Sequence, residues 1–375
     1  MTPEQPLRIL HAVRAPVGGI IRHILDLANG QIERGHLVGI VADSLTGGAR
    51  AEAAFAEIGP KLALGVHRIP IRREPHPLDI LAYLTFGRLI KRLRPQVLHG
   101  HGAKAGAFVR LRRYSDKSIR VYTPHGGSLH YPLNTAKGQF YGRLERALMN
   151  RTDLFLFESG FARNTYQRMI GTPKSLVQCV FNGVTAKEFD PLVTADDATD
   201  VVYVGEFRHI KGADLLVDAI ARLRAAGKPI TLTLAGDGEE MTALQAQCDR
   251  LNLGPAARFI GHVPARQGFS KGRLLVVPSR GDSMPYVVLE AAAAGIPMLA
   301  SKIGGIPEIF GADHPNLIPP GDVGALADAV AAATENTAVM RERAKALRDR
   351  VFQHFSQNAM VEGVLRAYGE AFREL

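Results

Sequence analysis

The chain has 375 residues, of which 46% are hydrophobic, 22% charged and 7% aromatic, a mixture that excludes collagen-like, low-complexity and wholly disordered proteins. At roughly 150 residues per domain, this length predicts two domains. The net charge of +10 belongs to the first half, because residues 1–190 hold 27 Lys and Arg against 14 Asp and Glu and the remainder holds 19 against 22; this asymmetry indicates nucleic acid or a membrane surface as partner, or else only a solvated basic face.

Short apolar runs alternate with amphipathic stretches along the first half. Strands are expected over residues 7–13, 37–42, 97–98, 119–123 and 154–157, and helices over residues 20–34 and 77–93. Such alternation is typical of a parallel sheet covered by helices on both faces. This half therefore predicts a Rossmann-like domain.

The pattern starts again after residues 189–200, an acidic stretch without periodicity that we interpret as the linker. Strands are expected over residues 201–204, 231–235, 258–260, 274–277 and 298–301, and helices over residues 213–225 and 285–294. The predicted fold class is α/β, with two Rossmann-like doubly wound domains, residues 1–190 and 191–356, facing a central cleft. We expect the helix within residues 357–375 to pack back on the first domain.

Two segments of the first domain follow strand ends, where such folds bind ligands. Gly18 and Gly19 stand between the first strand and its helix, where glycines let the backbone approach a phosphate; a tight turn without a ligand is the alternative. His125 follows the strand over residues 119–123 within Thr-Pro-His-Gly-Gly. It is a candidate polar or catalytic side chain, and a structural loop histidine is the alternative.

Two cations follow the first strand of the second domain. That strand ends at Gly205, and Arg208 and Lys211 precede the next helix. A cation beside the free N–H groups of a helix N-terminus can hold a diphosphate. The alternative is a pair of solvated loop cations.

Residues 279–294 are the most informative segment. Asp282 or Ser283 can cap the helix that follows, and Pro285 suits its first turn. Glu290 needs another explanation, because the rest of its helix is almost entirely Val, Leu and Ala and should be buried. A pair of ligand hydroxyls, such as those of a ribose, or a buried salt bridge would compensate its charge.

Two further observations concern the cellular compartment. The only cysteines are Cys179 and Cys248, without a CxxC or Cys/His context, so we expect buried free thiols in a reducing cytosol, with no disulfide and no zinc site. The first residues lack signal-peptide features, and no apolar stretch approaches about 18 residues. Membrane contact is therefore expected to be peripheral.

Taken in order along the chain, these segments resemble the retaining glycosyltransferases of family 4, which have the GT-B fold. The resemblance extends over nearly the whole chain, and the order and spacing of short motifs match those of the family. The motifs are Gly18-Gly19, Arg34-Gly35-His36, Thr123-Pro-His-Gly126, Asn182-Gly183-Val184, Ala235-Gly-Asp-Gly238, Gly304-Gly-Ile-Pro-Glu308, Pro319-Pro-Gly-Asp322 and the acidic pair Asp282 and Glu290.

The resemblance implies roles for the residues around the acidic pair. Glu290 would hold the nucleotide ribose. Asp282, where the family usually has Glu, would position the transferred sugar. Met284, Pro285 and Tyr286 fill the loop that meets the sugar and the diphosphate.

It also implies roles for the cations, the histidine and the glycine turns. Lys211 would neutralise the diphosphate together with Arg208, which would replace an arginine that the family often has at the position of Glu206. His125 would contact hydroxyls of the donor sugar. Three glycines belong to the donor-binding turns: Gly18, Gly19 and Gly205.

The resemblance implies an enzyme that moves a sugar, with retention of configuration, from a UDP- or GDP-sugar to a glycan or lipid-linked acceptor in cell-surface polysaccharide synthesis. We expect no cofactor and no metal, because no DxD-like acidic pair stands at a strand end. Many family members work at the cytoplasmic membrane face. We therefore expect a cytoplasmic protein that contacts anionic lipid at the inner face of the plasma membrane through its basic first domain, and no nucleic-acid partner.

Three other functions fit part of the sequence. A nucleotide-sugar epimerase can share this two-domain fold, but the acidic pair and Gly-Gly-Ile-Pro-Glu favour a transferase. A nicotinamide oxidoreductase is disfavoured, because neither half carries GxGxxG. A basic nucleic-acid-binding protein would account for the charge but not for the acidic pair, and no aromatic-interleaved basic motif is present.

Overall fold

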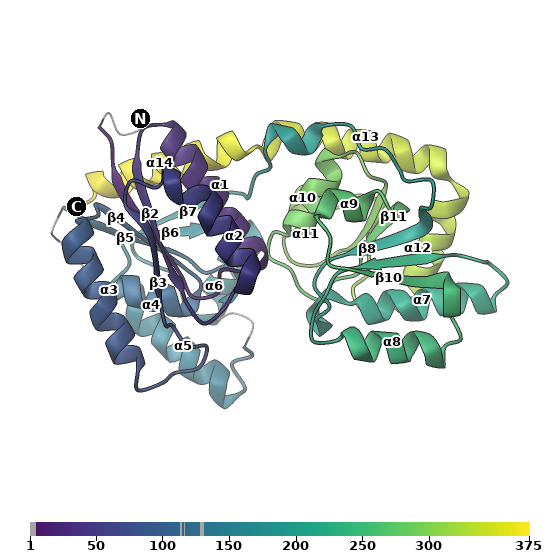
Figure 1. Cartoon of the computed structure of the whole chain (residues 1–375), viewed down its shortest axis with the longest axis horizontal. Helices are drawn as coiled ribbons and strands as arrows, with labels where there is room; N and C mark the ends of the chain where they lie inside the picture. Colours follow the sequence, from purple (N-terminus) through teal and green to yellow (C-terminus); the bar gives the residue numbers. More distant parts are fainter. Residues whose placement is uncertain (1–4, 113–114, 116, 128–130) are drawn as a thin grey trace. The chain divides into compact units, whose positions relative to one another are not determined.

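A computed structural model of the protein describes four stretches of the chain, residues 5–112, 115, 117–127 and 131–375. The chain divides into two compact units (Figure 1). The first consists of Met1–Asn182 together with Gln357–Leu375, and the second of Gly183–Ser356. The division after Asn182 comes earlier in the chain than the boundary expected at residue 190 from composition.

The first unit is built on seven parallel strands in the order β3-β2-β1-β4-β5-β6-β7. The strands are β1 (Arg8–Val13), β2 (Leu37–Asp43), β3 (Gly65–Ile69), β4 (Val97–His101), β5 (Ile119–Thr123), β6 (Leu154–Phe157) and β7 (Leu176–Cys179). The chain runs outward from β1 to β3, returns beside β1 as β4, and continues to the other edge. This order is the doubly wound arrangement, with its topological switch point between β1 and β4.

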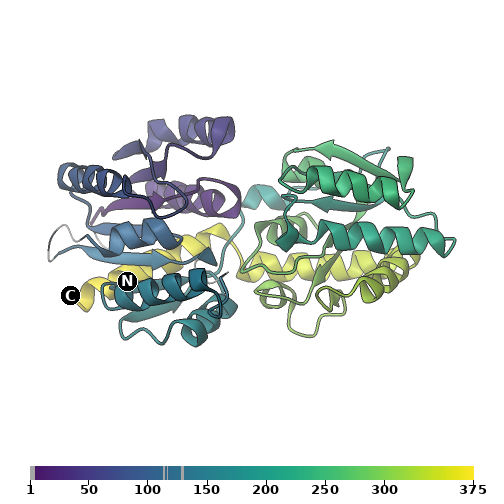
Figure 2. The same cartoon turned by 90° about the horizontal axis from the view of Figure 1, so that it is seen from below.

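Helices connect these strands and cover both faces of the sheet. They are α1 (Gly18–Glu33), α2 (Gly48–Ile58), α3 (Asp79–Leu93), α4 (Ala103–Arg110), α5 (Ala136–Met149) and α6 (Gly160–Met169). The last helix of the chain, α14 (Gln357–Arg373), lies against this sheet (Figure 2). Met360, Val364 and Tyr368 of α14 share one buried apolar cluster with β1, β4, β5 and β6.

Several predicted elements agree with the structure, and the differences have simple causes. The strand over residues 119–123 is β5, and that over residues 37–42 is β2. The edge strands β3 and β7 are mostly half-exposed, so they lack the buried run by which a strand is recognised in a sequence. The prediction that Gly18 and Gly19 form a turn before the helix is wrong, because they are the first two residues of α1.

The second unit is built on six parallel strands in the order β10-β9-β8-β11-β12-β13. They are β8 (Thr199–Val204), β9 (Leu232–Ala235), β10 (Ala257–Gly261), β11 (Gly272–Val277), β12 (Met298–Ser301) and β13 (Leu317–Ile318). The helices are α7 (Ala213–Ala225), α8 (Met241–Arg250), α9 (Ala265–Phe269), α10 (Tyr286–Ala293), α11 (Ile306–Phe310), α12 (Val323–Glu335) and α13 (Thr337–His354).

Alternate residues of each strand in the second unit point to opposite faces of the sheet. In β11, Leu274 and Val276 join a core with α7, α8 and α12. Leu275 and Val277 join a second core with α9, α10, α11 and α13. Both faces are therefore covered, and the prediction of two Rossmann-like parallel sheets is confirmed.

Not every basic residue of the first unit is available to a partner. Arg110 is fully buried, with one guanidinium nitrogen 2.7 Å from Glu145 and the group over the ring of Tyr122. Lys104 lies 2.7 Å from Asp79. Lys91, Arg92 and Arg94, at the end of α3, are exposed, whereas Arg113 lies outside the described residues. The formal charge of +13 thus overstates the cations available to a partner.

Candidate functional site

The switch point of the second sheet lies between β8 and β11. The chain leaves β8 toward β9 on one side and leaves β11 toward β12 on the other. Loops after such neighbouring strands separate and leave a crevice at the carboxyl ends, which is where open α/β sheets bind ligands. The predicted cations and the predicted Asp282 come from these two loops.

The structure brings Lys211 and Asp282 together. The Lys211 Nζ lies 2.8 Å and 3.0 Å from the two carboxylate oxygens of Asp282. The Ser279 hydroxyl donates to the same carboxylate at 2.9 Å, and the backbone N–H of Arg280 donates to the carbonyl of Ile210 at 2.8 Å. The two loops are therefore joined by both backbone and side chains, and a cation and a carboxylate meet at the switch point.

The prediction that Asp282 or Ser283 caps the following helix is wrong. The N-cap position of α10 is occupied by Pro285, in an extended conformation and without a side-chain cap. The carboxylate of Asp282 turns instead toward Lys211, which lies 71 positions earlier in the chain. The spacing of a cap motif is a local signal, and here a tertiary ion pair overrides it.

A third loop, after β12, closes around Asp282. The backbone N–H of Gly305 donates to the Asp282 carbonyl at 3.1 Å. Gly304 has φ of +62°, and a Cβ at this position would lie 1.5 Å from the same carbonyl oxygen. Only glycine fits there. The Gly-Gly-Ile-Pro-Glu motif therefore fixes the backbone of Asp282.

The loop after β8 is held by backbone and side-chain bonds, but its arginine stays accessible. The N–H of Gly205 donates to the Ala235 carbonyl at 3.0 Å, and the Tyr203 hydroxyl donates to the Glu206 carbonyl at 2.9 Å. The Arg208 side chain is 45% exposed, and its carboxylate neighbours Glu206 and Glu239 lie at 3.6 Å and 3.9 Å. Such long, exposed pairs leave Arg208 able to turn toward an anion.

Sequence reasoning missed a second arginine at this switch point. Arg280 makes a two-pronged ion pair with Asp214 of α7, at 2.7 Å and 2.6 Å, and donates to the carbonyl of His209. The hydrogen bonds that Arg280 donates to Asp214 raise the pKa of its guanidinium. Arg280 therefore ties the loop after β11 to the start of α7. Its place inside the segment of residues 279–294 was the available signal.

Helix α10 and the two residues before it are buried largely as expected. Met284 is 4% exposed, Tyr286 is 7% exposed, and Pro285 between them is buried too. Glu290 lies in the middle of this helix and is half-buried rather than fully buried. Asp282 and Glu290 thus stand before and within the helix that follows the switch-point loop.

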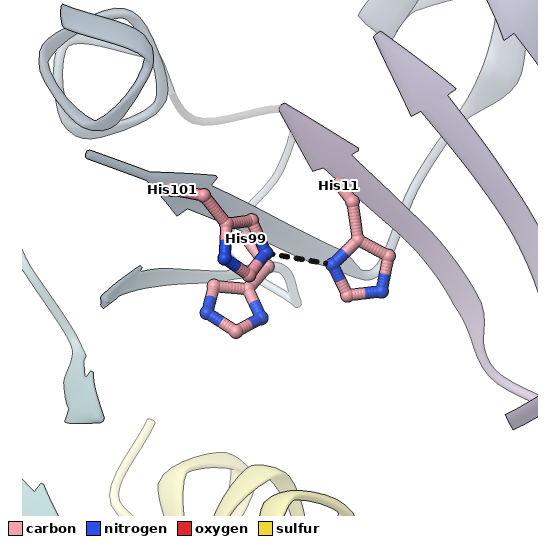
Figure 3. A group of neighbouring side chains, drawn as sticks. All are labelled: His11, His99 and His101. Atoms are coloured by element: carbon pink, nitrogen blue, oxygen red, sulfur yellow. Dashed lines mark hydrogen bonds between the residues drawn. The ribbon is translucent and has the colours of Figure 1, made fainter. Parts of the chain in front are cut away.

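Histidines gather at the switch point of the first sheet. His99 and His101 are alternate residues of β4 and so point to the same face, and His11 of β1 is the direct strand partner of His99. All three are at most 1% exposed, and Figure 3 shows their rings side by side. His23 of α1 and His125 after β5 complete the cluster, with their ring centroids 4.8 Å apart.

These imidazoles bond to one another and to neutral partners. Nδ1 of His11 lies 3.0 Å from Nε2 of His101, and Nδ1 of His101 lies 3.0 Å from Nε2 of His125. His99 is bonded to the hydroxyls of Tyr368 and Thr123. Burial lowers the pKa of His11 to about 4 and that of His125 to about 3. The cluster is therefore neutral at pH 7.

Two histidine groups have the proximity that a metal site needs. One is formed by His11, His99 and His101, and the other by His23, His101 and His125; in each, one possible ligand atom per residue lies within 4.8 Å of the others. Every ring nitrogen of the first group already has a hydrogen-bond partner. Imidazole would suit zinc or copper, but binding would replace bonds that the cluster has already made.

Sequence reasoning singled out only His125 of this cluster. His99 and His101 interrupt an apolar run at a spacing of two, which places both on one face of a strand, and this was the signal. The start of α1 belongs to the same unit, and Gly18 there has a positive φ of 57°. The structure thus brings His125 together with His23 of α1.

Comparisons with known proteins agree with this architecture. The family described as Glycosyltransferase Family 4 matches residues 17–188, and that described as Glycosyl transferases group 1 matches residues 198–336. Glycogen synthase of Mycobacterium tuberculosis is 25% identical over 385 residues, covering 95% of this chain and 92% of that protein. The gpi3 subunit of phosphatidylinositol N-acetylglucosaminyltransferase from Schizosaccharomyces pombe is 25% identical and covers 78% of this chain and 65% of its own length.

Solved structures show the same fold. Alr3699/HepE of Anabaena, in complex with UDP and glucose, superposes with a TM-score of 0.80 at 19% identity. The match covers 98% of this chain and 100% of that one. At this identity the likeness concerns the fold.

Proposed function

The chain belongs to glycosyltransferase family 4 and has the GT-B fold, and we propose that it moves a sugar from a nucleoside diphosphate sugar to a glycan or lipid-linked acceptor in cell-surface polysaccharide synthesis. The observation that carries this proposal is the meeting of Lys211 and Asp282 at the switch point of the second sheet. That position is where such sheets bind nucleotides. The donor is proposed to be a UDP- or GDP-sugar, and the anomeric configuration to be retained.

In this proposal Lys211 and Arg208 neutralise the diphosphate. The leaving group is a nucleoside diphosphate, so negative charge grows on phosphate oxygens in the transition state. Preorganised cations at that place stabilise the charge without reorganisation. Lys211 is preorganised by its two contacts with Asp282, while Arg208 is exposed and free to turn. These cations are proposed to meet the charge without a metal ion or other cofactor.

The two acidic residues are proposed to bind hydroxyl groups. Glu290 would accept hydrogen bonds from the ribose. Asp282 and the neighbouring loop of Met284, Pro285 and Tyr286 would position the transferred sugar, with Gly205 leaving room for the diphosphate. In the first unit, His125 would contact donor-sugar hydroxyls, and the Gly18-Gly19 start of α1 would add backbone N–H groups. Asp282 is assigned no covalent bond to sugar.

A thermal-shift screen followed by product analysis tests this function. A ligand that binds only the folded protein raises its apparent stability, so one class among UDP-, GDP- and ADP-sugars should raise the Tm. Incubation with that donor and membrane lipid or glycan extract should then release the nucleoside diphosphate and form a glycosylated product. A new epimer of the intact nucleotide sugar would identify the protein as an epimerase instead.

We also propose that α3 of the first unit contacts anionic lipid at the inner face of the plasma membrane. Its exposed face carries Ile80, Leu81 and Leu84, which are 66%, 59% and 44% exposed. One and two turns further on, the same face carries exposed cations, and no acidic residue occurs between positions 80 and 94. Apolar side chains beside cations are typical of a helix that lies in a membrane interface.

Neutralising two of these cations should weaken vesicle binding. Each cation near an anionic surface contributes about 1 kcal/mol, so Arg88→Gln with Lys91→Gln should lower the affinity for anionic vesicles roughly thirtyfold. The matched control is Arg341→Gln with Lys345→Gln, an exposed pair on α13. Sedimentation that is equal with neutral and anionic vesicles would reject the membrane contact.

A further inference from the structure

Four side chains form a row of hydrogen bonds in the first unit, which we call the hydrogen-bond chain. It begins at a residue of the core and ends at a partly exposed histidine. The Gln31 Oε1 lies 2.9 Å from Nε2 of His11, and His11 is bonded to His101 at 3.0 Å (Figure 3). His101 is bonded to His125, also at 3.0 Å. Gln31, His11 and His101 are at most 1% exposed. This hydrogen-bond chain thus has one buried end, Gln31, and one partly exposed end, His125.

The chemistry of these groups gives the chain a direction. A neutral imidazole has one N–H donor and one acceptor nitrogen, and burial holds the pKa of His11 and His101 below the ordinary value. The Gln31 amide faces His11 with its oxygen, and a carboxamide oxygen only accepts. With this amide orientation, Nε2 of His11 carries the proton and its Nδ1 accepts. His101 must therefore donate from Nε2 to His11, and accept at Nδ1 from Nε2 of His125.

His125 is placed by its backbone as well as by this bond. It is one of three described residues other than glycine with a positive φ, here +50°. This region is unfavourable for residues with a Cβ and is retained where the surrounding structure enforces it. The ring stacks on that of His101, with centroids 5.2 Å apart, and meets the edge of His23.

We propose that Gln31, His11 and His101 are positioning residues that fix His125 as the Nε2–H tautomer, so that its Nδ1 offers a lone pair to a hydroxyl group of the substrate. The identity of that hydroxyl, on the donor sugar, rests on the proposed function. The tautomer rests on the hydrogen-bond chain and on the Gln31 carboxamide oxygen that faces His11. The same logic predicts Nε2–H for His11, His101 and His125 together.

The tautomers can be measured directly in the wild-type protein. Long-range 1H–15N correlation spectra of protein labelled with 15N-histidine distinguish Nε2–H from Nδ1–H rings. We expect Nε2–H signals from His11, His101 and His125, assigned by the loss of one signal each in His11→Gln, His101→Gln and His125→Gln. A protonated Nδ1 on His125 would overturn the proposal, whether or not sugar transfer is ever observed.

Two substitutions at His101 separate positioning from a purely structural role. In His101→Asn the amide oxygen takes the place of Nδ1 and still accepts from His125, whereas in His101→Gln the amide lies at the place of Nε2 and this acceptor is lost. We expect His101→Gln to give a mixture of His125 tautomers and about a five- to tenfold lower kcat/KM, the effect of one misplaced hydrogen bond. His101→Asn should keep the tautomer.

The control is His67→Gln, the same substitution in β3, where the ring is bonded to the carbonyl of Leu64. It should change neither the His125 signals nor transfer. Affinity for the free nucleoside diphosphate should also stay unchanged in His101→Gln, because no histidine of the cluster is assigned a nucleotide contact. An unchanged His125 tautomer in folded His101→Gln would show that His101 does not position it.

Discussion

Lys211→Ala is expected to lower kcat/KM for sugar transfer by about a hundredfold to a thousandfold, the range found when one preorganised donor to developing charge is removed. Lys211 is held by both oxygens of Asp282. Without the ammonium group, the carboxylate would face the phosphates with no cation between them. We therefore expect weaker binding of the donor in the ground state and weaker stabilisation of the transition state.

The rate of nucleoside diphosphate release measures this effect, and Lys228→Ala is the matched control. Lys228 is also in the second unit and also pairs with a carboxylate, Glu335, at 2.6 Å, but both side chains are exposed. Exposed pairs contribute little to stability, so the control should behave as wild type. Glu290→Ala should reduce nucleotide binding severely, whereas the control Glu342→Ala on α13 should leave it unchanged. Wild-type kinetics in Lys211→Ala and Glu290→Ala would reject this site.

Mild acid is expected to unfold the first unit well before the second. His11, His23, His99 and His101 are at most 3% exposed, and burial lowers the pKa of each below the ordinary value of 6.5. Below pH 6.5 the unfolded state binds protons that the folded state excludes. The free energy of unfolding therefore falls with pH, from about 6.5 down to the folded-state pKa values, about 4 for His11.

The expected loss is large. At pH 5.5 the unfolded imidazoles are mostly protonated, so each of the four histidines costs on the order of 1 kcal/mol. Together this is a large part of the stability of a typical domain. Because the chain has two units, a single unfolding transition cannot be assumed. Hydrogen exchange measured at pH 7.5 and at pH 5.5 reports the stability of each unit separately, after correction for the pH dependence of the intrinsic exchange rate.

Peptides from β1 and β4 should lose protection at pH 5.5, while those from β8 and β11 keep it. Among the described residues, all buried histidines lie in the first unit. An equal loss in both units would show that the buried histidines do not govern acid sensitivity. Replacing His99 by Phe should reduce the pH dependence by about one proton, since this removes one of the titrating groups.

The elements that sequence analysis found are those with a buried run or a full amphipathic turn. Strand β5 and helix α7 have the expected bounds, because every strand position is at least half-buried and the helix has one apolar face. Edge strands β3 and β7 were missed, since half-exposed residues carry no such pattern. Short motifs located the switch-point loops, because glycine and proline requirements of tight turns are visible in sequence.

The contacts inside the site were less predictable, because they join distant segments. The residues of the histidine cluster come from β1, α1, β4 and the loop after β5. One hydroxyl that is bonded to His99 comes from Tyr368, near the end of the chain. No local sequence pattern predicts contacts between segments so far apart in the chain. Likewise, the partner of Asp282 is Lys211 and not the helix that follows it. The net charge also overstated the number of cations available to a partner, because Arg110 forms a buried ion pair with Glu145.

Product analysis with the donor that stabilises the folded protein tests the transferase proposal most directly. Wild-type protein should convert that nucleotide sugar to the free nucleoside diphosphate and a glycosylated acceptor, with the anomeric configuration of the donor kept in the product. The same reaction with Lys211→Ala should form at most about one hundredth of that product in equal time. Recovery of the intact donor or of its epimer, with no glycosylated product from any UDP-, GDP- or ADP-sugar, would contradict the proposed function.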